Sequence, residues 1–300
     1  SIHASMYYIN AFRYLNKQDY TTNSLKETIS KIESFTSSRY NLQISLSDVR
    51  SWLEQIRPEG VFSRSDIYHA IMYSLYLKNT SSDTWIEKNQ LNWTKAYEFI
   101  KDSPNRKVIL IYRDPRSVLA SFKNYTNAPK PAYLGSVFNS LSFFQTLIAL
   151  QNSSHLKNQI FSKSYESIIR DPLNYRKEVY QFLGKQSVNF TKEDLINNDG
   201  TNWQSNTTQD QKTIINEPLK LINSWKERLT SNEIGFCESI LTPYLEIFGY
   251  QSTKIQFQHQ DIINQLSSHK HTYNMYLKYL SSGSGTESFP SDPLDSSTWE

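Results

Sequence analysis

The clearest element that the pattern of apolar and polar positions predicts is a short strand from Val108 to Tyr112. Its residues are apolar and mostly β-branched, and charged residues bound the run, which is typical of a buried strand in a parallel sheet. Arg113 and Asp114 end the strand, and Pro115 fits the first turn of a helix that continues from Arg116 to Phe122. Arg113 is therefore expected at the carboxyl end of a strand beside a helix N-terminus, where open α/β sheets bind anionic ligands.

Apolar residues at helical spacing dominate the first 80 residues of the chain. No strand followed by a glycine-rich turn is predicted there. Four helical stretches are predicted, with these inward-facing positions: Tyr7, Ile9, Phe12 and Leu15; Leu25, Ile29, Ile32 and Phe35; Ile44, Val49, Leu53 and Ile56; and Ile67, Ala70, Ile71 and Leu75 in a helix from Ser65 to Leu77.

Beyond residue 80 the pattern predicts several helices besides the strand from Val108 to Tyr112. Gly184 is expected to close one of these helices, and Thr230 with Glu233 forms a capping box at the start of another. A loose helix is expected from Ile255 to Leu280, and a flexible tail rich in Pro, Ser, Asp and Gly follows it. The predicted helices are Leu91 to Lys101, Tyr133 to Leu150, Leu173 to Leu183 and Thr230 to Phe248.

Composition narrows the class of protein only a little. The 300 residues carry a net charge of +3, from 32 basic and 29 acidic residues, which is too balanced to predict a nucleic-acid partner. Cys237 is the one cysteine, so no disulfide within the chain is expected, and a reducing, cytoplasmic location is favoured. No run of about 18 apolar residues predicts a membrane span. The first residues lack the basic start of a signal peptide.

The segment RDPRSVLAS, which begins at Arg113, resembles the 3′-phosphate-binding motif of the sulfotransferases that use 3′-phosphoadenosine 5′-phosphosulfate (PAPS). In that family an arginine ends a strand and a serine follows eight residues later. Ser121 matches that spacing, so the resemblance implies that Arg113 and Ser121 hold the 3′-phosphate of the nucleotide. The plainer alternative is an ordinary strand, turn and helix with an arginine on the surface.

A second resemblance lies upstream, in the segment from Thr84 to Gln90. It is similar to the family's short strand that ends in Glu-Lys-Thr-Pro or Lys-Asp-Pro, and Lys88 lies 25 residues before Arg113, as the family spacing requires. The resemblance implies that Lys88 stabilises the negative charge that develops when the phosphosulfate bond breaks. The match is partial, because Asn-Gln stands where relatives carry Thr-Pro, and a solvated lysine is the alternative.

Three later segments follow in the family's order. The segment from Gln159 to Glu166 resembles the family's next core strand, which ends in Tyr-Glu. Tyr165 and Glu166 at its end open a block that resembles Tyr-Glu-Asp-Leu-x-x-Asp-Pro, and they are interpreted as structural. The loop from Asp199 to Thr208 resembles a loop of a largely bacterial branch that folds over the nucleotide, and Asn223 to Thr230 matches a Trp-Lys/Arg-x-x-Leu-Thr/Ser block. The resemblance to tyrosylprotein sulfotransferases is more distant. The nucleotide-binding candidates in these segments are Trp203, Asn206, Thr207 and Arg228, whereas Trp225 is predicted to lie in the core.

The sequence leaves the general base open. His69 and Glu87 are the candidates, because they lie on or before the strand that carries Lys88, although a structural histidine is the more ordinary interpretation. The family's N-terminal strand and its 5′-phosphosulfate loop, approximately Gly-x-x-x-Ser-Gly-Thr-Thr, are not found in residues 1–80.

Together these features predict a helix-rich α/β protein, a P-loop-like three-layer sandwich with a short parallel sheet flanked by helices. Residues 1–252 would form a sulfotransferase domain that lacks the N-terminal strand and phosphate loop, and residues 253–300 a partly helical extension. The expected activity is transfer of a sulfuryl group from PAPS, without a metal ion, to a hydroxyl or amine group of a small-molecule, saccharide or peptide acceptor. The alternatives are a non-catalytic nucleotide-binding relative and another P-loop phosphotransferase. The oligomeric state stays open.

Overall fold

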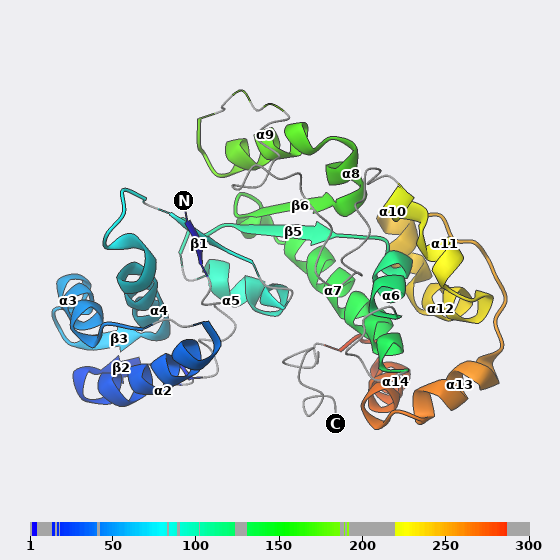
Figure 1. The fold of residues 1–300 in the computed structure, drawn as a ribbon, viewed down its shortest axis with the longest axis horizontal. Coiled ribbons are helices and arrows are strands. Elements are labelled where there is room, and N and C mark those ends of the chain that lie inside the picture. The colour runs from blue at the N-terminus through cyan, green and yellow to red at the C-terminus, as the bar shows by residue number, and fades with distance from the viewer. Residues whose placement is uncertain are drawn as a thin grey trace. The chain divides into compact units, whose positions relative to one another are not determined.

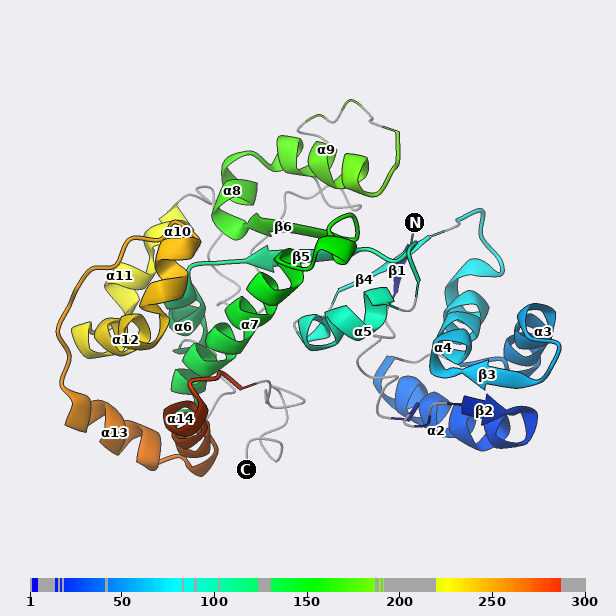
Figure 2. The same cartoon turned by 180° about the vertical axis from the view of Figure 1, so that it is seen from behind.

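The computed structural model describes residues 2–4, 14–15, 17, 19–40, 43–82, 84–88, 91–101, 103–123, 131–186, 189, 191 and 220–286 (Figure 1; Figure 2 shows the reverse side). The chain divides into two compact units, Ser1–Arg106 and Lys107–Glu300. The division falls just before the predicted strand from Val108 to Tyr112. Lys88 therefore belongs to the first unit, and Arg113 and Ser121 belong to the second.

The first unit combines two small strand pairs with helices. β1 (Ile2–Ala4) pairs in parallel with β4 (Trp85–Glu87), and β2 (Asp19–Thr21) pairs antiparallel with β3 (Val61–Ser63). The helices of this unit are α2 (Thr22–Tyr40), α3 (Leu46–Ile56), α4 (Arg64–Met72), a π-helix (Tyr73–Leu77), a 3-10 helix (Asn92–Lys95) and α5 (Ala96–Lys101).

Side-chain caps define where two of these helices begin. The Ser45 hydroxyl accepts a hydrogen bond from the backbone N–H of Asp48 at the start of α3. At the start of α4, Ser63 and Asp66 each accept from the other's backbone N–H, which completes a capping box. These caps satisfy backbone N–H groups that the first helical turn leaves without a partner.

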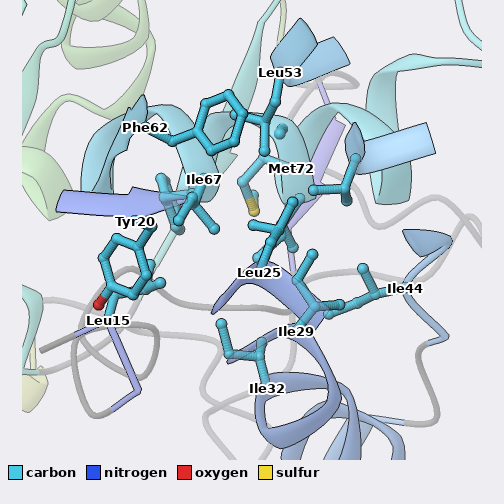
Figure 3. Close-up of a cluster of buried hydrophobic side chains, with 14 residues drawn as sticks. Leu15, Tyr20, Leu25, Ile29, Ile32, Ile44, Leu53, Phe62, Ile67 and Met72 are labelled. Atoms are coloured by element: carbon cyan, nitrogen blue, oxygen red, sulfur yellow. The ribbon is translucent and has the colours of Figure 1, made fainter. Parts of the chain in front are cut away.

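The predicted inward faces of these helices form the core of the first unit (Figure 3). The side chains on them are almost fully buried, as the helical spacing of the apolar residues requires. Tyr20 and Phe62, which face each other across the β2–β3 pair, join the same cluster. The predicted core positions confirmed in this cluster are Leu15, Leu25, Ile29, Ile32, Ile44, Val49, Leu53, Ile67, Ala70 and Ile71.

The prediction that the chain lacks an N-terminal strand is wrong, because β1 lies at residues 2–4 and pairs with β4. The β2–β3 pair was not predicted either. Each of these strands has only three residues, which is too short for an alternating pattern to show in the sequence. Residues 5–13, which follow β1 and include the predicted positions Tyr7, Ile9 and Phe12, lie outside the described residues.

The second unit is built on β5 (Val108–Tyr112) and β6 (Ile160–Ser164), which pair in parallel with Val108 opposite Ile160. This confirms both predicted strands and the parallel sheet. The elements around them are α6 (Pro115–Lys123), a 3-10 helix (Ala132–Leu134), α7 (Gly135–Gln151), a 3-10 helix (Ser154–Leu156), α8 (Tyr165–Arg170), α9 (Pro172–Phe182), α10 (Lys220–Asn223), α11 (Trp225–Arg228), α12 (Ser231–Ile247), α13 (His259–Ser267) and α14 (Lys270–Ser282).

Helices lie on both faces of this strand pair (Figure 1). Phe161 of β6 contacts Phe182 of α9, with ring centres 5.5 Å apart. The next residue points to the opposite face, where Ser162 accepts a 2.7 Å hydrogen bond from Gln151 at the end of α7. Because successive side chains of a strand point to opposite faces, α9 and α7 form the outer layers and the strands form the middle one.

Most of α7 is buried, as a central helix should be. The helical stretch Ala132–Gln151 is, within the described part of the chain, the single segment long and apolar enough to cross a membrane, and 72% of its most apolar window is buried inside the structure. Such burial is typical of the core helix of a folded domain.

The predicted ends of two helices are confirmed. Gly184 follows α9 with φ +69° and Gly249 follows α12 with φ +78°, a left-handed conformation that glycine adopts without strain. At the start of α12, the Thr230 and Glu233 side chains form the predicted capping box.

The prediction of a flexible tail from residue 281 is wrong for residues 281–286. Gly285 packs so closely on α7 that a Cβ atom there would lie 2.1 Å from the backbone nitrogen of Ser142. The Thr286 N–H donates a 3.2 Å hydrogen bond to the carbonyl of Phe138, and both Gly285 and Thr286 are buried. Helices α13 and α14 belong to the same compact unit as α7 and α12, so the described part of the C-terminal extension is part of the domain.

Candidate functional site

Arg113 lies at the carboxyl end of β5 and stacks on an aromatic ring from the neighbouring strand. Its guanidinium carbon is 4.6 Å from the centre of the Tyr165 ring, which follows β6 directly. The side chain is half-buried, and its Nε atom is buried without a hydrogen-bond partner. No carboxylate among the described residues forms an ion pair with Arg113. A cation held in place by stacking and lacking an acidic partner is suited to bind an anion.

Glu166 holds the turn that presents Arg113. Its Oε1 atom accepts a 3.0 Å hydrogen bond from the backbone N–H of Asp114, and its Oε2 atom accepts a 2.9 Å bond from the Tyr250 hydroxyl. Glu166 is 5% exposed. Burial, with the Glu166 charge beside the phenol, raises the pKa of Tyr250. The interpretation of Glu166 as a structural residue fits these contacts.

Arg116, three residues further on, has the opposite environment. It is 3% exposed, and its guanidinium donates to Asp114 at 2.7 Å and to Glu238 at 2.7 Å. The same group lies 4.1 Å from the centre of the Trp225 ring, which is itself buried, so the predicted core position of Trp225 is confirmed. Two carboxylates and one ring thus engage the Arg116 guanidinium, whereas the Arg113 guanidinium contacts the Tyr165 ring and pairs with no carboxylate in the described part of the chain.

Ser121 and Arg228, the two other described candidates of the second unit, lie near the end of α6 and at the end of α11. Ser121 is half-buried, and its hydroxyl makes no hydrogen bond within the described part of the chain. Lys123, two residues later, donates a 3.1 Å hydrogen bond to the backbone carbonyl of Arg228. This contact links α6, which carries Ser121, to the C-terminus of α11, which ends at Arg228. Through Lys123, the end of the helix that carries Ser121 is therefore hydrogen-bonded to the backbone of Arg228.

Lys88 and Glu87 lie in the first unit, at the end of β4. Lys88 is exposed and forms no ion pair with any residue that the structure describes. Glu87 is half-buried beside Tyr68, and burial together with the Glu87 carboxylate raises the pKa of that phenol well above its ordinary value. The last residue of β4 is thus a half-buried glutamate, and the residue after it is an exposed lysine.

His69 is poorly placed to act as a general base. The guanidinium of Arg106 donates to its Nε2 atom at 3.0 Å, so the lone pair that would accept a proton is already engaged. Burial, reinforced by the Arg106 charge, lowers the pKa of His69 to about 4. Its imidazole packs edge-on against Trp85 and Trp52. The structural interpretation of this histidine, which the sequence analysis gave as the more ordinary one, is the better one. Its partner Arg106 was not predicted, because it lies 37 residues away in the sequence.

Three candidates from the predicted nucleotide loop, Trp203, Asn206 and Thr207, lie outside the described residues. Sequence reasoning also missed three structural residues of the site, Arg116, Glu238 and Glu233. Arg116 stands in the same RDPR segment as Arg113, and no local signal distinguishes the two arginines. The capping box pointed to Glu233, but not to the contacts that it makes beyond the helix start.

A parallel strand pair flanked by helices, with an arginine that has no acidic partner among the described residues where a strand meets a helix, is the arrangement in which open α/β sheets bind anionic ligands. The chain belongs to the sulfotransferase family, since the family model matches residues 13–188. This confirms the predicted family. The matched range includes His69, Glu87, Lys88, Arg113 and Ser121.

Carbohydrate sulfotransferase 1 of Mus musculus is 24% identical to the chain over 170 residues, which are 49% of this chain and 39% of that protein. Carbohydrate sulfotransferase 3 of Tetronarce californica is 23% identical over 166 residues, 50% of this chain and 37% of that protein. The chain therefore spans well under half the length of the curated relatives that it matches. The sulfotransferase domain from the curacin biosynthetic pathway, a solved structure, covers 79% of this chain and 86% of its own at 13% identity, with a TM-score of 0.46.

Proposed function

We propose that this protein transfers a sulfuryl group from PAPS to a hydroxyl group of a saccharide. Membership of the sulfotransferase family supports the reaction class. The environment of Arg113 is the observation that carries the proposal to PAPS, because this arginine stacks on Tyr165 and forms no ion pair with any acidic residue that the structure describes. The names of the two carbohydrate sulfotransferases support a saccharide over the small-molecule and peptide acceptors.

In the proposed reaction, the guanidinium of Arg113 and the hydroxyl of Ser121 bind the 3′-phosphate of the donor. The oxygen of the acceptor hydroxyl attacks sulfur, the bond from sulfur to the phosphate oxygen breaks, and 3′-phosphoadenosine 5′-phosphate (PAP) leaves with the electron pair. The Lys88 ammonium neutralises the charge that grows on that phosphate oxygen, and Glu87 is the candidate that takes the proton of the acceptor. Because lysine and arginine supply this charge, the proposed reaction needs no metal ion.

A second candidate function is nucleotide binding without transfer. One observation favours it: residues 5–13, which follow β1, contain no glycine, whereas the family's 5′-phosphosulfate loop, which follows the N-terminal strand, depends on glycine. Such a protein would bind PAP through Arg113 and Ser121 and would transfer no sulfuryl group. Radiolabelled PAPS separates the two functions, because only the transferase moves label to a saccharide.

The test has two arms. Isothermal titration should show that PAP binds more tightly than AMP, which lacks the 3′-phosphate, and that Arg113→Ala removes this difference. Arg170→Ala, which removes an exposed arginine of α8 in the same unit, is the matched control and should change neither affinity. Equal affinity of the wild-type protein for PAP and AMP would overturn the assignment of Arg113.

The second arm measures label transfer from PAPS to a panel of saccharides that differ in the position of their free hydroxyl groups. Lys88→Ala should lower kcat about a hundredfold and leave PAP affinity unchanged, because its charge acts on the bond that breaks. Unchanged turnover of Lys88→Ala would remove Lys88 from the mechanism. Binding of PAP with no transfer to any saccharide would favour the second candidate function.

A further inference from the structure

The buried carboxylate of Glu233 accepts hydrogen bonds from three segments of the second unit. Glu233 is 3% exposed and lies in the first turn of α12. Its Oε1 atom accepts a 2.5 Å hydrogen bond from the hydroxyl of Tyr133, which precedes α7. Its Oε2 atom accepts from the Nζ atom of Lys123, at the end of α6, and from the backbone N–H of Thr230, each at 2.7 Å.

The capping box alone does not account for these contacts. A capping glutamate uses one oxygen to accept a hydrogen bond from the backbone N–H at the helix start. Here the Thr230 N–H donates that bond to Glu233. The bonds from Lys123 and Tyr133 lie outside the helix that Glu233 caps. They join the end of α6 and the start of α7 to the start of α12.

Lys123 connects this carboxylate to the predicted phosphate site. Besides its ion pair with Glu233, its Nζ atom donates to the backbone carbonyl of Arg228. Ser121 lies two residues before Lys123 on the same helix. The end of α6 with Ser121 and the end of α11 with Arg228 are thus held in one place through a single lysine, and Glu233 holds that lysine.

The charge of Glu233 makes this arrangement strong. Burial by itself raises the pKa of Glu233, but the hydrogen bonds from Lys123, Tyr133 and Thr230 outweigh burial, and the pKa is lowered overall. The carboxylate is therefore ionised at neutral pH. Its bond to the lysine is charge-assisted, and such bonds are about twice as strong as neutral ones.

We propose that Glu233 is a positioning residue for the 3′-phosphate of the donor: through Lys123 it fixes Ser121 and Arg228 in the geometry that binds this phosphate. The proposal rests on the proposed function and adds a residue that touches neither the nucleotide nor the reacting atoms. Loss of a positioning residue should change the ratio of PAP affinity to AMP affinity, because the two nucleotides differ in the 3′-phosphate. Loss of a purely structural residue should leave this ratio unchanged.

The experiment compares the affinity of the folded protein for PAP and for AMP. Glu233→Gln should weaken PAP binding about tenfold, or roughly 1.4 kcal/mol, and AMP binding less than about twofold. Lys123→Met and Tyr133→Phe leave the helix cap intact, so they test the role even if Glu233→Gln fails to fold. Lys123→Met should match Glu233→Gln, and Tyr133→Phe should give a smaller loss of PAP affinity.

Leu241→Ala is the matched control, because Leu241 is fully buried in the same helix but lies eight residues, or about 12 Å along the helix axis, beyond Glu233. It should lower the melting temperature and leave the PAP to AMP affinity ratio unchanged. If the wild-type protein discriminates PAP from AMP and Lys123→Met discriminates equally well, the positioning role is wrong while the proposed function stands. If the wild-type protein binds both nucleotides equally, the proposed function fails, and this role fails with it.

Discussion

Arg113 stacks on Tyr165, with the guanidinium carbon 4.6 Å from the ring centre, although 52 residues separate the two in the sequence. Parallel pairing of β5 and β6 produces this contact, because it brings the carboxyl ends of both strands to the same edge. The ring orients the cation without neutralising it, and no acidic residue in the described part of the chain forms an ion pair with Arg113.

Tyr165→Leu should therefore weaken PAP binding by about two- to fivefold, because a stacked cation at a partly exposed site gains about 0.5–1 kcal/mol from the ring. Tyr165→Phe keeps the ring and should bind PAP as the wild-type protein does. Titration calorimetry of the three proteins checks the prediction. Equal PAP affinity of the Leu and Phe variants would show that the ring does not orient Arg113.

Arg116→Met should destabilise the second unit by about 3–5 kcal/mol, because it leaves the buried carboxylates of Asp114 and Glu238 without their cation. The matched control is Lys163→Met, which breaks a partly exposed pair with Glu178 and should cost less than about 1 kcal/mol. Urea unfolding followed by circular dichroism measures both. Similar losses for the two variants would contradict the structural role of the Arg116 pair.

The lowered pKa of His69 predicts that the folded protein loses stability in mild acid. The pKa of His69 in the folded protein, about 4, lies below the ordinary value of 6.5, so the folded state disfavours the protonated imidazole. The neutral form of His69 therefore contributes fully to the free energy of unfolding above pH 6.5. This contribution is lost as the pH falls from 6.5 towards 4. The loss amounts to at most about 3 kcal/mol.

His69→Gln removes this titration and should flatten the dependence of unfolding free energy on pH between 6.5 and 4. Urea unfolding at several pH values measures it. The control is His155→Gln, which replaces an exposed histidine and should keep the wild-type pH profile. A wild-type profile in His69→Gln would show that His69 is not held in its neutral form.

Gly285→Ala should destabilise the second unit by about 1–3 kcal/mol, because the new methyl group would overlap the backbone of Ser142 and Phe138 in α7. Ser284→Ala, one residue earlier, meets no such contact and should be nearly neutral. Thermal unfolding compares the two. Equal melting temperatures would mean that residues 283–286 do not pack on α7 in solution.

The sequence by itself determined the local elements and the family. The strand from Val108 to Tyr112 was predicted with its observed bounds, because five apolar residues between charges leave little alternative. The caps at Thr230 and Gly184 were predicted because they depend on residues a few positions apart. The order and spacing of several motifs identified the sulfotransferase family, which the matching family model confirms.

Tertiary structure alone decided what individual charges do. Arg113 and Arg116 stand three residues apart in one motif, yet Arg116 is buried in two ion pairs and Arg113 has none with the residues that the structure describes, because the second partner of Arg116, Glu238, comes from 122 residues away. The same holds for His69, which Arg106 engages, and for Glu233, whose cluster draws on α6 and the start of α7. Charge interactions depend on distance and burial in space, and a sequence specifies neither until the chain has folded.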